Sequence, residues 1–130
     1  MIVLDASAAL EILLQTPAGS SMTARVLEHE EDLHAPHLLD VEIAQALRRL
    51  CLRGHLGSSR AAAVLEDLSG LPLERHGHDL LLPCAWELRE NLTVYDAVYV
   101  ALAELLQVPL LTRDTRIRNA PGHVATVEVF

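Results

Sequence analysis

Two kinds of hydrophobic pattern alternate along the chain. Short apolar runs, each closed by a polar or turn residue, predict buried strands. They fall at residues 1–4, 33–35, 71–75, 108–112 and 125–129. Longer stretches with apolar residues at three- and four-residue steps predict helices. They fall at residues 6–14, 20–30, 38–53, 58–68, 79–91, 93–106 and 114–118.

Strands that alternate with helices predict an α/β fold. We expect a three-layer α/β/α sandwich in which helices cover both faces of a short, mostly parallel central sheet. No linker, internal repeat or low-complexity segment interrupts the pattern, so residues 1–130 are expected to form a single domain. In such sheets ligands bind in the crevice outside the carboxyl ends of the strands. Candidate chemistry is therefore sought at residues that follow strands.

Four acidic residues stand where that crevice is expected. Asp5 follows the first strand, and Asp114 lies two residues beyond Thr112, which ends a later strand. Asp96 and Glu42 lie near the starts of two helices. Each acid alone fits a helix cap or a solvated first-turn residue. Together they would repel one another, which is expected to raise their pKa values, and a divalent cation is the usual compensation. Because these four side chains supply only oxygen ligands, they predict a site for Mg²⁺ or Mn²⁺.

Several arginines accompany these acids. Arg49 lies seven residues after Glu42 and so occupies roughly the same helix face, and Arg113 and Arg116 flank Asp114. Arginine forks suit phosphate oxygens, and an acidic metal centre rimmed with arginine is what phosphodiester cleavage needs. Salt bridges within an acid-rich chain account for the same arginines equally well, and both interpretations stay open at this point.

Composition excludes some function classes. The chain has a formal net charge of −8 and no lysine, which rules out a phosphate-binding loop and Schiff-base chemistry. The acidic balance argues against coating nucleic acid with a basic face, but bound metal ions can invert the charge of an acidic cleft. Two cysteines make no disulfide framework. No signal peptide or membrane-spanning run is predicted, so the cytoplasm is the expected location.

The histidines offer a competing metal site. His76 with His78, and His34 with His37, are spaced closely enough to suggest transition-metal ligands. They fall at predicted loops and element ends, where solvated histidine is common, so a zinc site is not expected. A Ser–His–Asp triad is not expected either, because no nucleophile-elbow glycines surround Ser7.

Four segments of the chain resemble the PIN-domain ribonucleases, and specifically the VapC toxins of bacterial toxin–antitoxin pairs. They are residues 2–7 (IVLDAS), 36–42 (PHLLDVE), 92–104 (LTVYDAVYVALAE) and 109–114 (PLLTRD). They occur in the family's order and spacing, and the resemblance extends over nearly the whole chain. The resemblance implies a PIN-like fold and a metal-dependent endoribonuclease, the toxin of a type II pair, that hydrolyses RNA with a water activated by Mg²⁺ or Mn²⁺.

The resemblance also implies a role for each polar residue of the predicted site. The acids of the catalytic centre are Asp5, Glu42, Asp96 and Asp114. Asp5 and Asp96 are implied to be the main metal ligands, and Ser7 and Thr112 to be their polar support. Many relatives carry asparagine three residues after the glutamate of this helix, whereas this chain has Gln45.

Three partners follow from the resemblance: an RNA substrate, a VapB-like antitoxin that wraps the toxin and blocks its site, and a second copy in a homodimer. Arg49, Arg113 and Arg116 are the candidates for contact with RNA or antitoxin. Two other classes stay open. One is a catalytically silent PIN-like module that binds RNA or protein. The other is a phosphorelay receiver, which the missing lysine disfavours. A DNA-cleaving relative is a weaker option.

Overall fold

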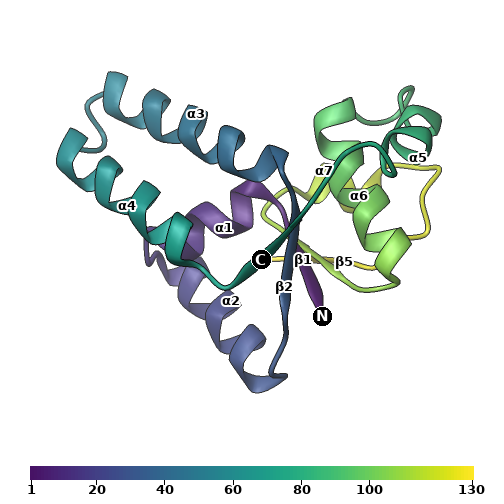
Figure 1. Cartoon of the computed structure of the whole chain (residues 1–130), viewed down its shortest axis with the longest axis horizontal. Helices are drawn as coiled ribbons and strands as arrows, with labels where there is room; N and C mark the ends of the chain where they lie inside the picture. The colour runs from purple at the N-terminus through teal and green to yellow at the C-terminus, as the bar shows by residue number, and fades with distance from the viewer.

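A five-stranded sheet, parallel throughout, forms the centre of the molecule (Figure 1). The computed structural model describes all residues, 1–130, and orders the strands β3-β2-β1-β4-β5. The strands are β1 (Ile2–Leu4), β2 (Leu33–Pro36), β3 (Leu73–His76), β4 (Leu110–Thr112) and β5 (Val127–Val129). The predicted parallel sheet is confirmed, with no antiparallel member.

Helices cover both faces of this sheet. They are α1 (Ala6–Leu13), α2 (Pro17–Glu28), α3 (Leu38–Leu52), α4 (Ser58–Gly70), α5 (Leu82–Glu87), α6 (Val94–Leu106) and α7 (Thr115–Asn119). Figure 1 shows α1 to α4 on one side of the strands and α5 and α6 on the other. α1 packs against α2, α3 and α4, whereas α6 packs against β1, β2 and β4. The predicted α/β/α sandwich is therefore confirmed. None of the helices combines the length and the hydropathy that crossing a membrane requires.

The order of the strands decides where a site can form. The chain builds β1, β2 and β3 outward in one direction, then returns to place β4 on the other side of β1 and β5 beyond it. The direction of winding thus reverses between β1 and β4, and a crevice opens outside the carboxyl ends of strands at such a point. Asp5 directly follows β1, and Thr112 is the last residue of β4.

Helix α6 is buried on all sides. Seven consecutive residues, Ala97–Ala103, are buried, as expected for a helix held between a sheet and another helix, here α5. Its start is capped by Thr93, whose Oγ1 accepts a hydrogen bond of 3.1 Å from the Asp96 N–H. Its end is set by Gln107, which adopts the left-handed conformation with φ 57°. Asp96 is thereby fixed in the first turn of a buried helix, next to the strand ends.

Two predicted helices differ from the observed bounds by three or more residues at an end, and the others by one or two. α2 begins at Pro17, three residues before the predicted start, because Thr16 caps it and proline suits a first helical position. The helix predicted over 79–91 shrinks to α5, Leu82–Glu87. After Glu87 the main-chain hydrogen bonds join residues three apart, as from the Arg89 N–H to the Trp86 carbonyl. The residues after Glu87 therefore form turns rather than α-helix, although the spacing of buried residues still resembles that of a helix.

The expectation that the histidines are solvated is wrong for His34. It lies inside β2, between β1 and β3, and is 5% exposed. His76 is the last residue of β3 rather than part of a loop. The apolar run at residues 33–35 therefore contains a buried imidazole, which hydrophobic periodicity alone does not reveal.

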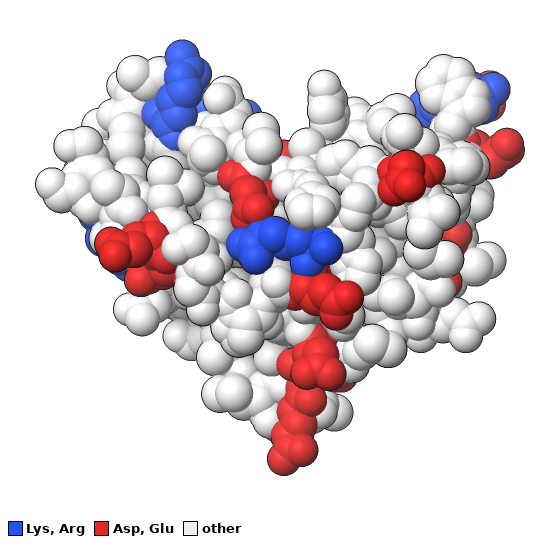
Figure 2. Space-filling view, in the orientation of Figure 1, with Lys and Arg blue, Asp and Glu red and all other residues white.

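The surface reflects the acidic composition. On the face shown in Figure 2, acidic groups are scattered and basic groups are isolated, so no continuous basic surface appears there. The outline of this face is notched between the side that carries α3 and α4 and the side that carries α5 and α6. On this face, contact with an anionic polymer would rely on a few local cations.

Candidate active site

A cavity of about 370 Å³ lies beside the carboxyl ends of β1 and β4. All four acids singled out from the sequence line it. The complete lining is Asp5, Ala6, Ser7, Leu10, Glu42, Ala46, Arg49, Asp96, Tyr99, Asp114 and Arg116. Four carboxylates and two guanidiniums leave a formal excess of two negative charges. We call this lining the acidic cavity.

Asp5 is the most tightly held of the four acids. It is 5% exposed and caps α1 by accepting a hydrogen bond of 2.8 Å from the Ala8 N–H. Ser7 Oγ donates to Asp5 Oδ1 over 2.6 Å, and the Thr112 hydroxyl donates to Oδ2. Burial raises the pKa of Asp5, while the hydrogen bonds from Ser7 and Thr112 oppose that rise. Both carboxylate oxygens are thus fixed by the two residues predicted to support them.

Glu42 is positioned by a residue that the sequence reasoning missed. The Tyr99 hydroxyl donates a hydrogen bond of 2.6 Å to Glu42 Oε1, and Tyr99 is 1% exposed. Burial raises the pKa of Glu42, and the charges of Asp96 and Asp5 raise it further against the Tyr99 hydrogen bond. Burial also raises the pKa of Tyr99, which keeps the phenol protonated as a donor. The spacing of Tyr99, three residues after Asp96 on one helix face, is the sequence signal that could have found it.

Asp96 lies in the first turn of α6 and also lines the acidic cavity. Its N–H is bound by the helix cap, whereas its carboxylate faces the cavity. Burial raises the pKa of Asp96, the negative charge of Asp114 adds to the rise, and Thr93 and Arg116 oppose it. The Thr93 side chain thus stabilises both the N–H and the carboxylate of Asp96.

Asp114 differs from the other three acids. It caps α7 by accepting from the Arg116 N–H over 2.9 Å, and the Arg116 guanidinium donates to both its oxygens, the shortest bond being 2.6 Å. This pairing lowers the pKa of Asp114. The expectation that repulsion raises the pKa of all four acids is therefore wrong for Asp114, because a neighbouring cation neutralises it. For the other three, burial rather than repulsion is the main cause.

The three predicted arginines do not share one place. Arg49 and Arg116 line the acidic cavity, and the Arg116 side chain is 85% exposed. Arg113 points instead to the carboxylate of Glu11, 3.7 Å away, and to the main-chain oxygen of Phe130. Its main-chain N–H donates to Ser7 Oγ over 3.0 Å. The cationic rim of the cavity consequently rests on Arg49 and Arg116.

A smaller cavity of about 230 Å³ adjoins the acidic one. It is lined by Leu38, Val41, Glu42, Gln45, Arg49 and Tyr95. Gln45 lines this smaller cavity and not the acidic one. The two cavities share Glu42 and Arg49, while Val41 and Tyr95 present exposed apolar surface. An apolar recess thus borders the mouth of the acidic cavity.

The lining of the acidic cavity fits a hard divalent cation. Every acidic group there offers carboxylate oxygen, and no histidine or cysteine is present. Oxygen-only donor sets suit Mg²⁺ and Mn²⁺ rather than softer metals. A bound cation would also relieve the cost of keeping Asp5, Glu42 and Asp96 ionised where burial raises their pKa. Asp5, Glu42 and Asp96 form no ion pair with a guanidinium, in contrast to Asp114, so these three carboxylates are available to a cation.

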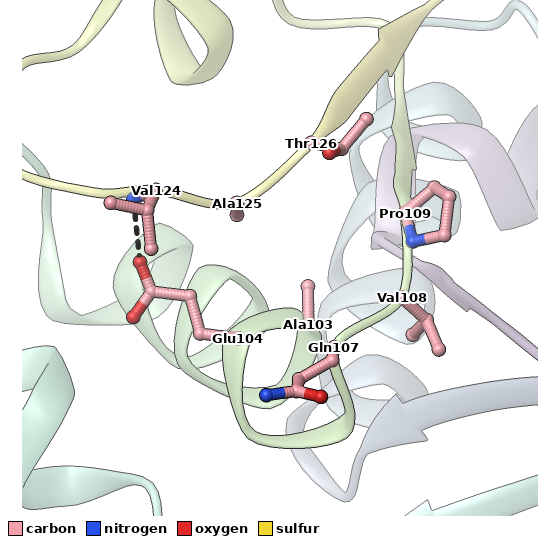
Figure 3. A pocket seen from close by; sticks show the side chains of 8 residues that line it. All are labelled: Ala103, Glu104, Gln107, Val108, Pro109, Val124, Ala125 and Thr126. Atoms are coloured by element: carbon pink, nitrogen blue, oxygen red, sulfur yellow. Dashed lines mark hydrogen bonds between the residues drawn. The ribbon is translucent and has the colours of Figure 1, made fainter.

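A second cavity of similar size offers much less chemistry. Its volume is about 310 Å³. Figure 3 shows it between the end of α6, the approach to β4 and the segment that precedes β5. Glu104 is its one charged side chain. Glu104 Oε1 accepts from the Val124 N–H, the dashed line in Figure 3, and Oε2 accepts from Cys84 Sγ. Both oxygens are engaged, and this end of the sheet carries the amino ends of the strands, where ligands do not usually bind.

The chain was compared with protein families and with individual sequences. The family model described as PIN domain matches residues 2–122. Ribonuclease VapC12 of Mycobacterium tuberculosis is 41% identical over 129 residues, covering 99% of this chain and 98% of that protein. Ribonuclease VapC1 of the same species is 45% identical over 121 residues, covering 92% of this chain and 90% of the relative.

Solved structures share the fold. PAE2754 from Pyrobaculum aerophilum superimposes with a TM-score of 0.72 at 23% identity, covering 97% of this chain and 82% of that one. VapBC2 from Rickettsia felis, bound to a DNA fragment from its promoter, gives a TM-score of 0.71 at 14% identity, covering 99% and 98%. At these identities the likeness concerns the fold alone.

Proposed function

This chain belongs to the PIN-domain family and, within it, to the VapC ribonucleases, and from that premise we propose that it is a divalent-metal-dependent endoribonuclease, the toxin of a type II toxin–antitoxin pair. Its relatives at 41–46% identity carry the name ribonuclease. The observation that carries the proposal is the meeting of four carboxylates from four distant segments in one cavity.

Each residue of the acidic cavity has a distinct task in this proposal. A Mg²⁺ or Mn²⁺ ion, when bound, supplies the charge neutralisation and the acidification of water that phosphodiester hydrolysis needs. Asp5 and Asp96 hold it, and Ser7 and Thr112 keep the Asp5 carboxylate from rotating away. Glu42, with a raised pKa, is suited to accept a proton from the attacking water.

Asp114 has a different task, because its charge is already compensated. It holds Arg116 at the rim, where the guanidinium can reach a phosphate that flanks the cleaved bond. Arg49 contributes the second cation from α3. Two guanidiniums over a metal centre give local attraction for RNA in a protein whose net charge is −8.

The test is cleavage of RNA by the purified chain with Mg²⁺ or Mn²⁺, before and after chelation. Asp96→Asn keeps the shape of the side chain and the Thr93 cap but removes a charge that holds the cation. Activity is expected to collapse in this variant and in chelator. Asp67→Asn is the matched control, because Asp67 is exposed on α4, outside the cavity, and it should cleave at the normal rate. Undiminished cleavage by Asp96→Asn, or in chelator, would contradict the metal-dependent mechanism, whereas no cleavage by the wild type with either metal would point to a silent binding module.

A VapB-like antitoxin is the proposed protein partner, and a second copy of the chain is the proposed dimer partner. The apolar recess beside the acidic cavity supports the first part, because a peptide seated there would also reach Glu42 and Arg49. If a small protein is encoded next to this chain, its co-expression should abolish cleavage and yield one complex. Sedimentation of the chain alone tests the dimer. Cleavage that persists within such a complex would contradict blockage of the site.

A further inference from the structure

Three side chains with metal-binding atoms meet on β2 and β3, away from the acidic cavity. They are His34, Glu74 and His76, which we call the histidine cluster. His34 is paired with Glu74 in the parallel register of the two strands. Because side chains alternate along a strand, these three project from one face of the sheet. Arg75 projects from the other face, where its guanidinium binds Asp40.

The ligand atoms form a triangle of the size that a zinc ion requires. His34 Nδ1 lies 2.9 Å from His76 Nε2 and 3.7 Å from a carboxylate oxygen of Glu74. His76 Nε2 lies 4.0 Å from the other oxygen. Tetrahedral zinc, with bonds of about 2.0–2.2 Å, holds its ligand atoms roughly 3.3–3.5 Å apart. The three distances bracket that value, so small side-chain rotations close the set on one ion.

Within this cluster, a hydrogen bond joins the two imidazoles but does not reach Glu74. The two facing nitrogens can share only one hydrogen, and the Glu74 oxygens lie beyond hydrogen-bond distance of both rings. His34 is almost fully buried, and its Nε2 has no hydrogen-bond partner. His34 Nδ1, which faces His76 and Glu74, is therefore the ring atom that is placed to bind an ion. The carboxylate of Glu74 beside the two ring nitrogens completes a donor set that suits a cation.

We propose that His34, Glu74 and His76 bind a divalent transition-metal ion, with Zn²⁺ as the best match. Two imidazole nitrogens and one carboxylate oxygen form a borderline set that the oxygen-only acidic cavity cannot offer. Glu74 has 68% of its side chain exposed, so the fourth coordination position opens to solvent. The proposal does not depend on ribonuclease activity.

The position of the site implies what the ion does. It joins β2 to β3, the strand at the edge of the sheet. The main-chain oxygen of His76 accepts from the His37 N–H over 2.9 Å, directly before α3, and His78 Nε2 accepts from the Leu38 N–H at the start of that helix. A metal on the histidine cluster therefore braces the edge of the sheet from which α3 departs.

Zinc binding by the full-length, tag-free chain tests the proposal. Zn²⁺ is titrated against a chromophoric chelator in several millimolar Mg²⁺, which fills the acidic cavity, and Co²⁺ is added separately as a spectroscopic probe. We expect one tight Zn²⁺ site per chain and the intense visible absorption of four-coordinate Co²⁺. His76→Gln and Glu74→Gln should each weaken Zn²⁺ binding about tenfold or more, since even outer-shell changes cost about 10–100-fold.

Two control variants show whether the bound Zn²⁺ lies on the histidine cluster. His55→Gln removes an exposed histidine outside the cluster and should leave Zn²⁺ affinity unchanged. Asp96→Asn should also keep the Zn²⁺ site, because it alters only the acidic cavity. Glu74→Gln keeps the test valid if His76→Gln misfolds, since Glu74 is exposed. Equal Zn²⁺ affinity in the wild type and in Glu74→Gln, or loss of the site in Asp96→Asn, would overturn the proposal.

Discussion

The acidic cavity and the histidine cluster lie on the same sheet and are built in opposite ways. The cavity draws its carboxylates from the ends of β1 and β4 and from α3 and α6, so it exists only when the whole sheet is assembled. The histidine cluster draws all three ligands from two neighbouring strands. One offers oxygen alone, and the other offers two imidazoles and one carboxylate.

If both proposals hold, this difference explains how one small chain would select two different cations. Oxygen donors from several elements make a roomy and strongly negative site, which suits a hydrated hard ion. Imidazoles held by adjacent strands make a narrow site with fixed geometry, which suits a borderline ion. Each site should therefore respond to its own metal and to its own mutations.

The largest expected effect is on catalysis, from Asp5→Asn. The variant keeps the size of the side chain but loses the charge that is fixed between Ser7 and Thr112. Losing roughly 4 kcal/mol of transition-state stabilisation lowers a rate about a thousandfold. Initial rates of RNA cleavage at saturating Mg²⁺ measure it. Zn²⁺ affinity measured in parallel should not change, and a matching loss of both would mean that the two regions are not separate.

The second expected effect is on stability, which should depend on pH in the absence of metal and respond differently to Mg²⁺ and to Zn²⁺. Burial raises the folded-state pKa of Asp5, Glu42 and Asp96 above their unfolded values. The metal-free folded state then binds more protons than the unfolded state, so stability falls as pH rises from about 4 through the raised folded values. Asp114 has the opposite sign, because its lowered pKa adds stability that is lost as pH falls through that value. Asp96→Asn should therefore melt higher than wild type in chelator near neutral pH.

Added metal sharpens the same comparison. At a hundredfold excess over its dissociation constant, Mg²⁺ should raise the free energy of unfolding of the wild type by about 2.7 kcal/mol. For a chain of this size, each kcal/mol raises the melting temperature by roughly 3–6 °C. Asp96→Asn should lose most of that response to Mg²⁺ while keeping its response to Zn²⁺. Thermal melts of both proteins with each metal give the result. If Asp96→Asn melts lower than wild type in chelator, Asp96 serves its own helix instead of the cation.

The third effect comes from Tyr99→Phe, which leaves Glu42 without its donor. A hydrogen bond to a charged group contributes roughly 1.5–3 kcal/mol, so the variant should be less stable by about that amount where Glu42 is ionised. The loss should shrink at low pH, where Glu42 is protonated, because the absent bond favours the charged form. Melts at about pH 4 and about pH 7 test this. Tyr95→Phe, exposed on the same helix, is the control and should show no such pH dependence.

The smallest effect is expected from Arg116→Ala. Its removal frees Asp114, whose pKa should rise towards the ordinary value, and it removes one candidate phosphate contact. The slope of binding against salt should fall by about 0.7 for single-stranded RNA. Binding measured over a range of salt concentrations tests this, with the exposed Arg118→Ala as the matched control. An identical slope in both variants would leave Arg116 with the structural role of holding Asp114.

Part of the site was predictable because it follows from position along the chain. Asp5 and Thr112 end apolar runs, and parallel strands bring such ends to one edge. The resemblance added the roles of Asp96 and Glu42. The Tyr99 contact to Glu42 was not predicted, because it joins α6 to α3, and the spacing of residues within either helix does not indicate a contact between them. The sequence also did not predict that Arg113 points away from the cavity, because its direction depends on where Glu11 and the end of the chain lie.

The sequence by itself determined the succession of strands and helices, the three-layer class and the residues that end strands, because hydrophobic periodicity and capping are local properties of the chain. Only the tertiary structure decided that Arg116 neutralises Asp114 and that His34 is buried. It alone brought His34 to Glu74 and His76, through the register of β2 against β3. Register and packing are set by contacts between segments far apart in the chain, and such contacts produce no periodic pattern in the sequence.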